Sequence, residues 1–144
     1  MDPILLEFIR KNRISVLGVL SPEGGPHSAT LHYAHRENPL SFLFVTERDS
    51  RKCRSLLDDE EHKASLVIGF SEEEFATLQM EGNIKILSNE KELEKAWADF
   101  LQKYPSSAKR KVNPNFVVLQ FVPTWWSYRN LKTNPITKIS SDEK

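Results

Sequence analysis

A chain of 144 residues, of which 39% are hydrophobic, is long enough to form one domain with a buried core. Twenty basic and twenty acidic residues give a formal charge of zero, so we expect neither a nucleic acid nor a membrane surface as partner. No apolar run approaches the roughly 20 residues of a membrane-spanning helix. Cys53 is the single cysteine, which excludes an internal disulfide. Glu7 and Arg10 interrupt the first apolar residues, so we expect no secretory signal and a cytoplasmic protein.

The first part of the chain predicts a short helix followed by strands. Asp2-Pro3 is typical of a helix start, and apolar residues at helical spacing continue the helix to about Asn12. A turn rich in Pro and Gly then joins two strands into a hairpin, and a third strand follows a second turn. These strands are expected at Ile14–Leu20, His27–His35 and Leu40–Thr46.

The remaining part predicts two helices and three further strands, at Lys63–Phe70, Phe75–Leu87 and Asn115–Val122. The helices are expected at Ser50–Leu57 and from Asn89 to the Tyr104-Pro105 stop, before a polar, frayed tail at 131–144. Six strands with short turns and no alternating βαβ units predict a mainly β domain over residues 1–130. We therefore expect an antiparallel β-barrel with flanking helices.

The strongest local signal for binding is Ser50-Arg51-Lys52, which follows an apolar strand and opens a predicted helix. The first turn of a helix carries unpaired backbone N–H groups and partial positive charge. A hydroxyl, a guanidinium and an ammonium at that point suit a phosphate. An ordinary capped helix with solvated charges explains the same residues, so the local pattern leaves both readings open.

Phe42–Leu57 resembles the strand–turn–Ser-Arg-Lys–helix segment of the pyridoxamine 5′-phosphate oxidase-like flavin-binding split barrels. The strands at Ile14–Leu20 and Pro26–His35, the Leu78–Gly82 strand and the Phe100–Pro105 helix end follow in that family's order. The resemblance implies a six-stranded antiparallel split β-barrel of the FMN-binding type. It also implies that Ser50, Arg51 and Lys52 hold the 5′-phosphate of FMN.

The resemblance implies further contacts to FMN and a homodimer with the cofactor at the subunit interface. The backbone of Ser28, Ala29, Thr30 and Leu31 would run along the flavin, with Val45 and Thr46 as a second contact and Thr77 or Gln79 as a polar neighbour. Trp125 and Trp126 would flank the flavin across the interface, although they could equally close the end of the barrel or pack between subunits.

Other chemistry is poorly supported by the sequence. Strand alternation puts His27 and His35 on one face and His32 on the other, so we expect no metal site. Cys53 is better explained as a small buried residue than as a reactive thiol, and no nucleophile elbow, P-loop or Rossmann fingerprint is present. The sequence identifies no catalytic side chain.

A true pyridoxamine 5′-phosphate oxidase is not expected. The family's substrate-binding extension after the last strand finds no counterpart, and Ser28 and Tyr33 stand where the family has Arg and Lys. The leading hypothesis is an FMN-dependent oxidoreductase that acts on a small-molecule substrate or electron donor. The alternatives are a haem-binding or haem-degrading split barrel, a barrel that uses the deazaflavin F420, and a non-catalytic flavin-binding or sensing module.

Overall fold

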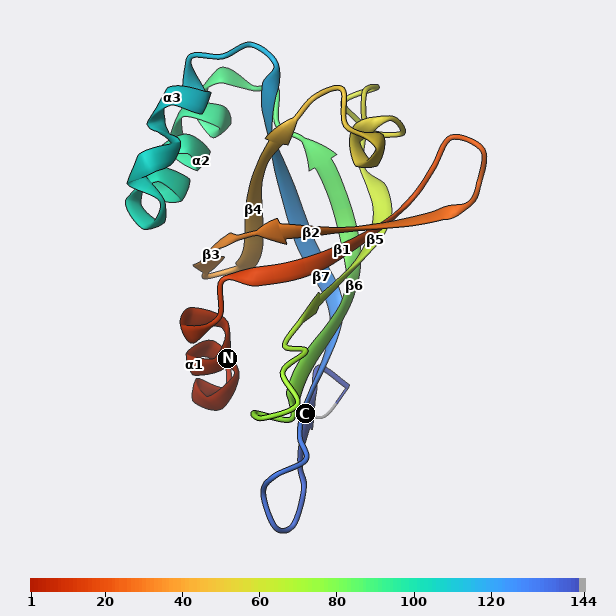
Figure 1. Cartoon of the computed structure of the whole chain (residues 1–144), viewed down its shortest axis with the longest axis vertical. Helices are drawn as coiled ribbons and strands as arrows, with labels where there is room; N and C mark the ends of the chain where they lie inside the picture. The colour runs from red at the N-terminus through yellow and green to blue at the C-terminus, as the bar shows by residue number, and fades with distance from the viewer. Residues whose placement is uncertain (143–144) are drawn as a thin grey trace.

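The computed structural model describes residues 1–142 as an antiparallel sheet flanked by helices (Figure 1). Helices α1 and α2 begin at side-chain caps, where Asp2 accepts from the Ile4 N–H and Asn89 from the Glu92 N–H. None of the helices in this range is long and apolar enough to cross a membrane. The elements are α1 (Pro3–Lys11), β1 (Ile14–Leu20), β2 (Pro26–His32), β3 (Ala34–Glu37), β4 (Leu40–Glu47), η1 (Arg51–Cys53), β5 (His62–Ile68), β6 (Ala76–Ile86), α2 (Glu90–Lys103), η2 (Pro105–Ser107), α3 (Ala108–Lys111), β7 (Phe116–Asn130) and β8 (Thr137–Ser140).

The strands follow the order β2-β1-β5-β6-β7-β4-β3, with β8 paired to the second half of β7. The sheet curls on itself, α2 and α3 lie together beside its upper end, and α1 lies below them on the same side of the view (Figure 1). This is the mainly β split-barrel fold that the sequence predicts. The expected number of six strands is wrong, because the predicted strand His27–His35 divides at Tyr33 and the tail supplies β8. Residues 143 and 144 of that tail lie outside the described range.

Strand β4 is buried from Leu40 to Thr46 because it packs on both faces. Phe42 and Phe44 belong to the main core inside the barrel, whereas Leu43 and Val45 belong to a second core with Trp97 and other residues of α2. Side chains alternate between the two faces of a strand, so a strand covered on both faces requires a continuous apolar run. This explains why the sequence shows no alternation here.

Strand β6 pairs with β7 along its whole length, with a shift in register between Glu81 and Gly82. A Cβ atom on Gly82 would lie 2.8 Å from the Cα of Pro123 and would collide with the Val122 carbonyl oxygen. The shift leaves Thr124 without a partner on β6 and pairs Gly82 with Pro123, which has no N–H to donate to the sheet. The pairing of β6 with β7 therefore requires glycine at position 82.

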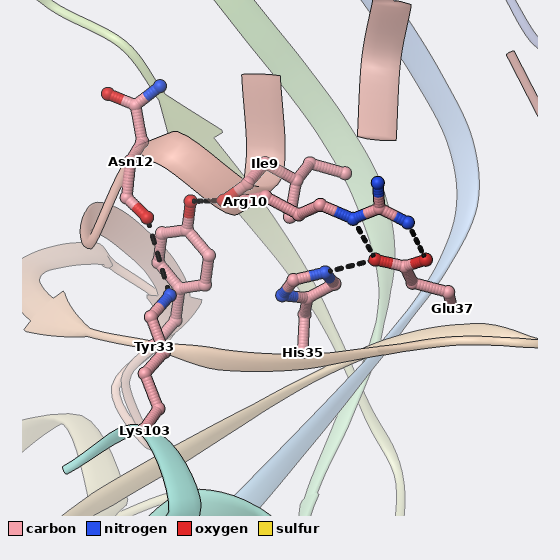
Figure 2. A network of polar contacts seen from close by, with 7 residues as sticks. All are labelled: Ile9, Arg10, Asn12, Tyr33, His35, Glu37 and Lys103. Atoms are coloured by element: carbon pink, nitrogen blue, oxygen red, sulfur yellow. Dashed lines mark hydrogen bonds and ion pairs between the residues drawn. The ribbon is translucent and has the colours of Figure 1, made fainter. Parts of the chain in front are cut away.

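A polar network joins α1 to β3 and to the end of α2 (Figure 2). The Tyr33 hydroxyl donates to the Ile9 carbonyl at 2.6 Å, and the Lys103 ammonium approaches the Asn12 carbonyl at 3.4 Å. The backbone N–H of Tyr33 also donates to the carbonyl of Arg13 at 3.0 Å. These contacts fix the path of the chain from α1 into β1, and they set the position of Arg13.

The exposed edge of this network is an ion pair in which Arg10 donates twice to Glu37, with His35 as a further neighbour of the same carboxylate (Figure 2). The Arg10 and His35 hydrogen bonds lower the pKa of Glu37 to about 2. Burial lowers the pKa of His35, which opposes its protonation beside Glu37. The carboxylate is thus ionised well below its ordinary titration range.

We expect Glu37→Gln to destabilise the protein at neutral pH and to have a smaller effect at about pH 3. A lowered carboxyl pKa stabilises the fold above the ordinary pKa of 4.5, and that stabilisation disappears as the pH falls toward 2. Urea denaturation of both proteins at about pH 7 and about pH 3 measures the difference. Glu94→Gln, which removes the exposed pair with Lys111, is the matched control. An equal difference between wild type and Glu37→Gln at both pH values would contradict the prediction.

Candidate functional site

Two adjoining pockets lie where β2, β4 and the η2–α3 segment meet. The first, the turn pocket, has a volume of about 290 Å³ and is lined by Thr46, Glu47, Ser50, Lys52 and Phe116. The second, the helix pocket, has a volume of about 340 Å³ and is lined by Arg13, Thr30, His32, Tyr104, Ser106 and Ser107, with Phe100 at its apolar side. Leu31, Val45 and Arg110 line both pockets, so the two form one continuous site.

The turn after β4 gives the turn pocket its polar wall. The Ser50 hydroxyl donates to the Glu47 carbonyl at 2.7 Å, and the Ser50 N–H donates to the same oxygen at 3.2 Å. The helix predicted at Ser50–Leu57 is wrong: η1 is a single 3₁₀ turn over Arg51–Cys53, followed by further turns. Cys53 and Leu56 are both fully buried three residues apart, which matches the repeat of a 3₁₀ helix. So short an element has almost no macrodipole, and side chains must provide the positive charge.

Two cations face the turn pocket from different parts of the chain. Lys52 is half-buried and comes from η1, whereas Arg110 comes from α3 and places its guanidinium 5.3 Å from the centre of the Phe116 ring. Among residues 1–142 neither Lys52 nor Arg110 forms an ion pair. Glu47 is exposed and also lines the turn pocket, so its carboxylate offsets one of the two positive charges. The balance of charge in this pocket therefore favours an anion.

The rest of the Ser50–Cys53 segment points elsewhere. Arg51 is exposed and lies outside the lining of both pockets. Cys53 is fully buried, and burial raises the pKa of its thiol. Cys53 is therefore a packing residue with an unreactive thiol, in agreement with the interpretation of the sequence.

Strand β2 brings its predicted site residues to two different hollows. Thr30 and Leu31 line the helix pocket, and Leu31 also reaches the turn pocket. Ser28 lines a separate shallow hollow of about 660 Å³ on the outer face of β1, β2, β5 and β6, while Ala29 is half-buried on the inner face. Because β2 ends the strand order, one of its edges lacks a neighbouring strand and leaves backbone groups free to bind.

The other predicted residues lie away from the two pockets within one chain. Thr77 donates to the Ile68 carbonyl at 3.4 Å, and Gln79 is exposed on β6. Trp125 donates to the Asp142 carboxylate at 2.7 Å, and Trp126 packs against the main core. These four residues share the paired ends of β6 and β7, where Gln79 faces Ser127 and Thr77 faces Arg129.

The histidines lie in different elements, because the strand predicted at His27–His35 divides and places His35 on β3. His32 lines the helix pocket, whereas His35 contacts Glu37 and His62 contacts Asp58. Within residues 1–142 no three His, Cys, Asp or Glu side chains are placed to hold a metal ion.

Sequence reasoning missed Arg13, Arg110, Ser106 and Ser107 as site residues. The basic stretch between Leu101 and Lys138 is a weak signal, because solvated surface lysines and arginines give the same pattern. Arg13 carries no signal at all, since its position beside Tyr104 depends on how α1 packs against α2 and β3.

Comparison with known proteins identifies relatives of the whole domain. The family model described as pyridoxamine 5′-phosphate oxidase matches residues 1–130, while no curated protein matches significantly. A Clostridium acetobutylicum structure described as related to general stress protein 26 of the pyridoxinephosphate oxidase family has a TM-score of 0.70 and 21% identity, covering 97% of this chain and 94% of that one.

Two further structures share the fold. A pyridoxamine 5′-phosphate oxidase-related, FMN-binding protein from Nostoc punctiforme has a TM-score of 0.70 and 19% identity, covering 96% of this chain and 89% of that one. A haem-binding protein from Mycobacterium smegmatis has a TM-score of 0.73 and 16% identity, covering 94% of this chain and 55% of that one. At these identities the similarity supports the fold.

Proposed function

Since the chain belongs to the pyridoxamine 5′-phosphate oxidase family, we propose that it binds FMN at the turn pocket and acts as a flavin-dependent oxidoreductase. The observation that carries the proposal is the convergence of Ser50, Lys52 and Arg110 on one pocket beside Thr46. A phosphate is bound best by several positively charged hydrogen-bond donors, and Lys52 and Arg110, which form no ion pair within residues 1–142, can supply them. The Nostoc punctiforme relative, described as FMN-binding, supports this choice of cofactor.

The flavin ring would follow β2 from Leu31 toward Ser28. Backbone N–H and C=O groups at the free edge of this strand can meet the donors and acceptors at the rim of the ring. Val45 contributes an apolar contact between the strand and the phosphate. The bound flavin would supply the electron transfer, and the protein would contribute binding and orientation.

Vitamin B6 oxidation is not part of the proposal. The resemblance puts Tyr33 where the family has a lysine, and Tyr33 is fully buried with its hydroxyl donating to the Ile9 carbonyl. Ser28 is a short neutral side chain at the position of the family's arginine. Neither residue supplies the positive charge that a phosphorylated pyridine substrate would need at those positions.

We further propose a homodimer with the cofactor at the subunit interface. Gly18 faces Ser28 and Ser65 across neighbouring strands, so small residues flatten the outer face of β1, β2 and β5. A second copy could pack closely against such a face. Thr77, Gln79, Trp125 and Trp126, which lie outside the pockets of their own chain, would then approach the cofactor of the partner.

A haem-binding function is the second candidate. His32 lines the helix pocket beside Tyr104, with 5.7 Å between the ring centres, so its imidazole would be available to hold a haem iron. The Mycobacterium smegmatis relative, described as haem-binding, supports this candidate. A barrel that uses F420 would bind it in the same pocket and differs from the main proposal in the mass of its cofactor. A non-catalytic sensing module would use the same pocket and differs in showing no turnover.

We expect the protein purified without added cofactor to show a flavin absorption spectrum and to release a molecule with the mass of FMN on heating. If the protein is purified free of cofactor, added FMN should bind with quenching of its fluorescence. Light scattering should give about twice the chain mass of 16.6 kDa. A Soret band would favour haem, and the mass of F420 would replace FMN. Consumption of NAD(P)H with an electron acceptor separates an oxidoreductase from a sensing module.

A further inference from the structure

An apolar groove of about 370 Å³ lies at the turn between β5 and β6 and belongs to neither pocket of the candidate site. Three large side chains line it and remain exposed to solvent: Phe70 is 58% exposed, Phe75 50% and Leu131 41%. The Leu131 N–H donates to the Phe75 carbonyl at 2.9 Å, which ties the turn to the end of β7. Large apolar side chains gathered in one exposed groove indicate a surface that another protein covers.

The backbone of the turn holds Phe75 in a strained conformation. Its φ is 52°, in the left-handed region that a bulky residue rarely adopts. The Phe75 N–H donates to the Ser71 carbonyl at 2.9 Å, and the Glu74 N–H donates to the Ser71 hydroxyl at 3.4 Å. An aromatic ring held at a strained and exposed position indicates a contact outside its own chain.

The rim of the groove is acidic. Glu72 lines the groove and Glu73 follows it, and both side chains are exposed. Neither forms an ion pair within residues 1–142, whereas Glu74 pairs with Lys11 at 3.7 Å. A partner that covers the groove must therefore bring positive charge together with an apolar contact.

Helix α3 and the residue after it have both of these properties. The helix carries Lys109, Arg110 and Lys111 in succession, and Val112, which follows them, is 83% exposed. Lys111 pairs with Glu94 at 3.0 Å, but Lys109 and Arg110 form no ion pair in the part of the chain that the structure describes. The segment 108–112 therefore complements the groove in charge and in its apolar side chain.

Within one chain the groove and α3 lie far apart. Helix α3 lies beside the upper end of the sheet, and the turn between β5 and β6 lies near the lower end (Figure 1). A two-fold axis that crosses the long axis of the molecule would bring the upper end of each copy beside the lower end of the other. Such a contact is the same in both directions, so it forms twice in one dimer.

From these observations we propose that the groove at the β5–β6 turn binds the 108–112 segment of a second copy of this chain. Phe75 would pack against Val112 of the second copy, and Glu72 and Glu73 would face its Lys109. The apolar contact would exclude water, and the opposite charges would fix which end of the second copy binds.

The inference rests on the proposed homodimer and extends it. Thr77 lines the groove, and the proposed dimer takes Thr77 toward the cofactor of the partner. Arg110, which belongs to α3, lines both pockets of that cofactor site. A groove beside Thr77 would therefore meet α3 of the second copy. The two ends of the dimer would then add to the contact across the outer face of β1, β2 and β5.

Sedimentation velocity over a range of protein concentrations measures the dissociation constant of the dimer. Glu72→Lys/Glu73→Lys should raise this constant tenfold or more, because like charges then meet at both copies of the contact. Lys109→Glu/Lys111→Glu should have the same effect. An equal mixture of the two double variants should recover dimers with nearly the wild-type constant, since each groove can then meet an α3 of opposite charge.

Two further variants separate the contact from general effects of charge and folding. Glu60→Lys/Glu61→Lys reverses two exposed acids on the turn before β5 and should leave the dissociation constant unchanged. Phe75→Asn should raise the constant and keep the fold, because asparagine adopts the left-handed conformation more readily than phenylalanine. Circular dichroism of each variant checks that the fold is kept.

The outcomes distinguish this inference from the proposed function. If the mixture of the two double variants stays dissociated, or if neither variant dissociates, the docking contact is overturned, and FMN binding is unaffected by that result. If FMN does not bind but the mixture recovers dimers, the proposed function fails and the docking contact is supported. A wild-type protein that sediments as a single chain at every concentration overturns both the homodimer and the docking contact.

Discussion

Gly82→Ala is expected to destabilise the protein by about 3 kcal/mol or more, because the added methyl group meets only backbone atoms. The new Cβ would lie 2.8 Å from the Cα of Pro123 and 2.9 Å from the carbonyl carbon of Val122. A flexible side chain could move away, but these atoms belong to β7, which pairs with both β6 and β4. The substitution must therefore shift the bulge or separate the central strands. Urea denaturation gives the change in unfolding free energy.

Gly25→Ala is the matched control for Gly82→Ala. A Cβ at Gly25 would meet only the Ser21 hydroxyl, at an ordinary 3.7 Å. We expect its effect on the unfolding free energy to stay within about 0.5 kcal/mol. If Gly82→Ala does not fold at all while Gly25→Ala folds normally, the prediction is also supported. A Gly82→Ala protein as stable as Gly25→Ala would contradict the role of the bulge.

Lys52→Ala is expected to weaken FMN binding tenfold to a hundredfold and to leave the fold intact. A charge-assisted hydrogen bond to a phosphate contributes about 1.5–3 kcal/mol, and Lys52 faces the turn pocket without an ion pair in the described range. Riboflavin, which lacks the phosphate, separates this contribution from contacts to the ring. Its affinity should be the same for the wild type and for Lys52→Ala.

Arg51→Ala provides the neighbouring comparison. Arg51 is exposed and lies outside the turn pocket, so its removal should change FMN affinity by less than Lys52→Ala does. The double variant Arg51→Ala/Lys52→Ala should resemble Lys52→Ala. If FMN and riboflavin lose affinity equally in Lys52→Ala, the phosphate does not bind at this lysine. If neither FMN nor riboflavin loses affinity in Lys52→Ala, the FMN site lies elsewhere.

Local sequence signals predicted most helices and strands of this protein. Asp2-Pro3 and Asn89 mark the starts of α1 and α2, and the side chains of Asp2 and Asn89 are the caps. These signals work because capping involves residues close in the sequence. The helix predicted after Ser50 is wrong: the backbone there forms successive turns, in which the N–H groups of Cys53, Arg54 and Leu56 each donate to the carbonyl three residues earlier.

Several of the residues proposed to bind FMN lie together in the fold, and their role in binding stays a prediction. Thr30, Leu31, Val45, Thr46, Ser50 and Lys52 were proposed from the sequence, and the fold brings them to the two pockets. Arg13 and Arg110 could not be proposed in the same way, because each looks like an ordinary exposed arginine in its own segment. Their role depends on the aromatic rings of Tyr104 and Phe116, which come from other elements.

The sequence by itself determined the antiparallel β class, the start of each longer helix and the turn that carries Ser50 and Lys52. These features follow from side-chain alternation, capping and turn residues, which act over a few positions of the chain. The tertiary structure alone decided the number of strands, the bulge at Gly82 and the meeting of Arg13 with Arg110. These depend on contacts between distant segments, whose free energy is gained only once the strands and helices have packed together.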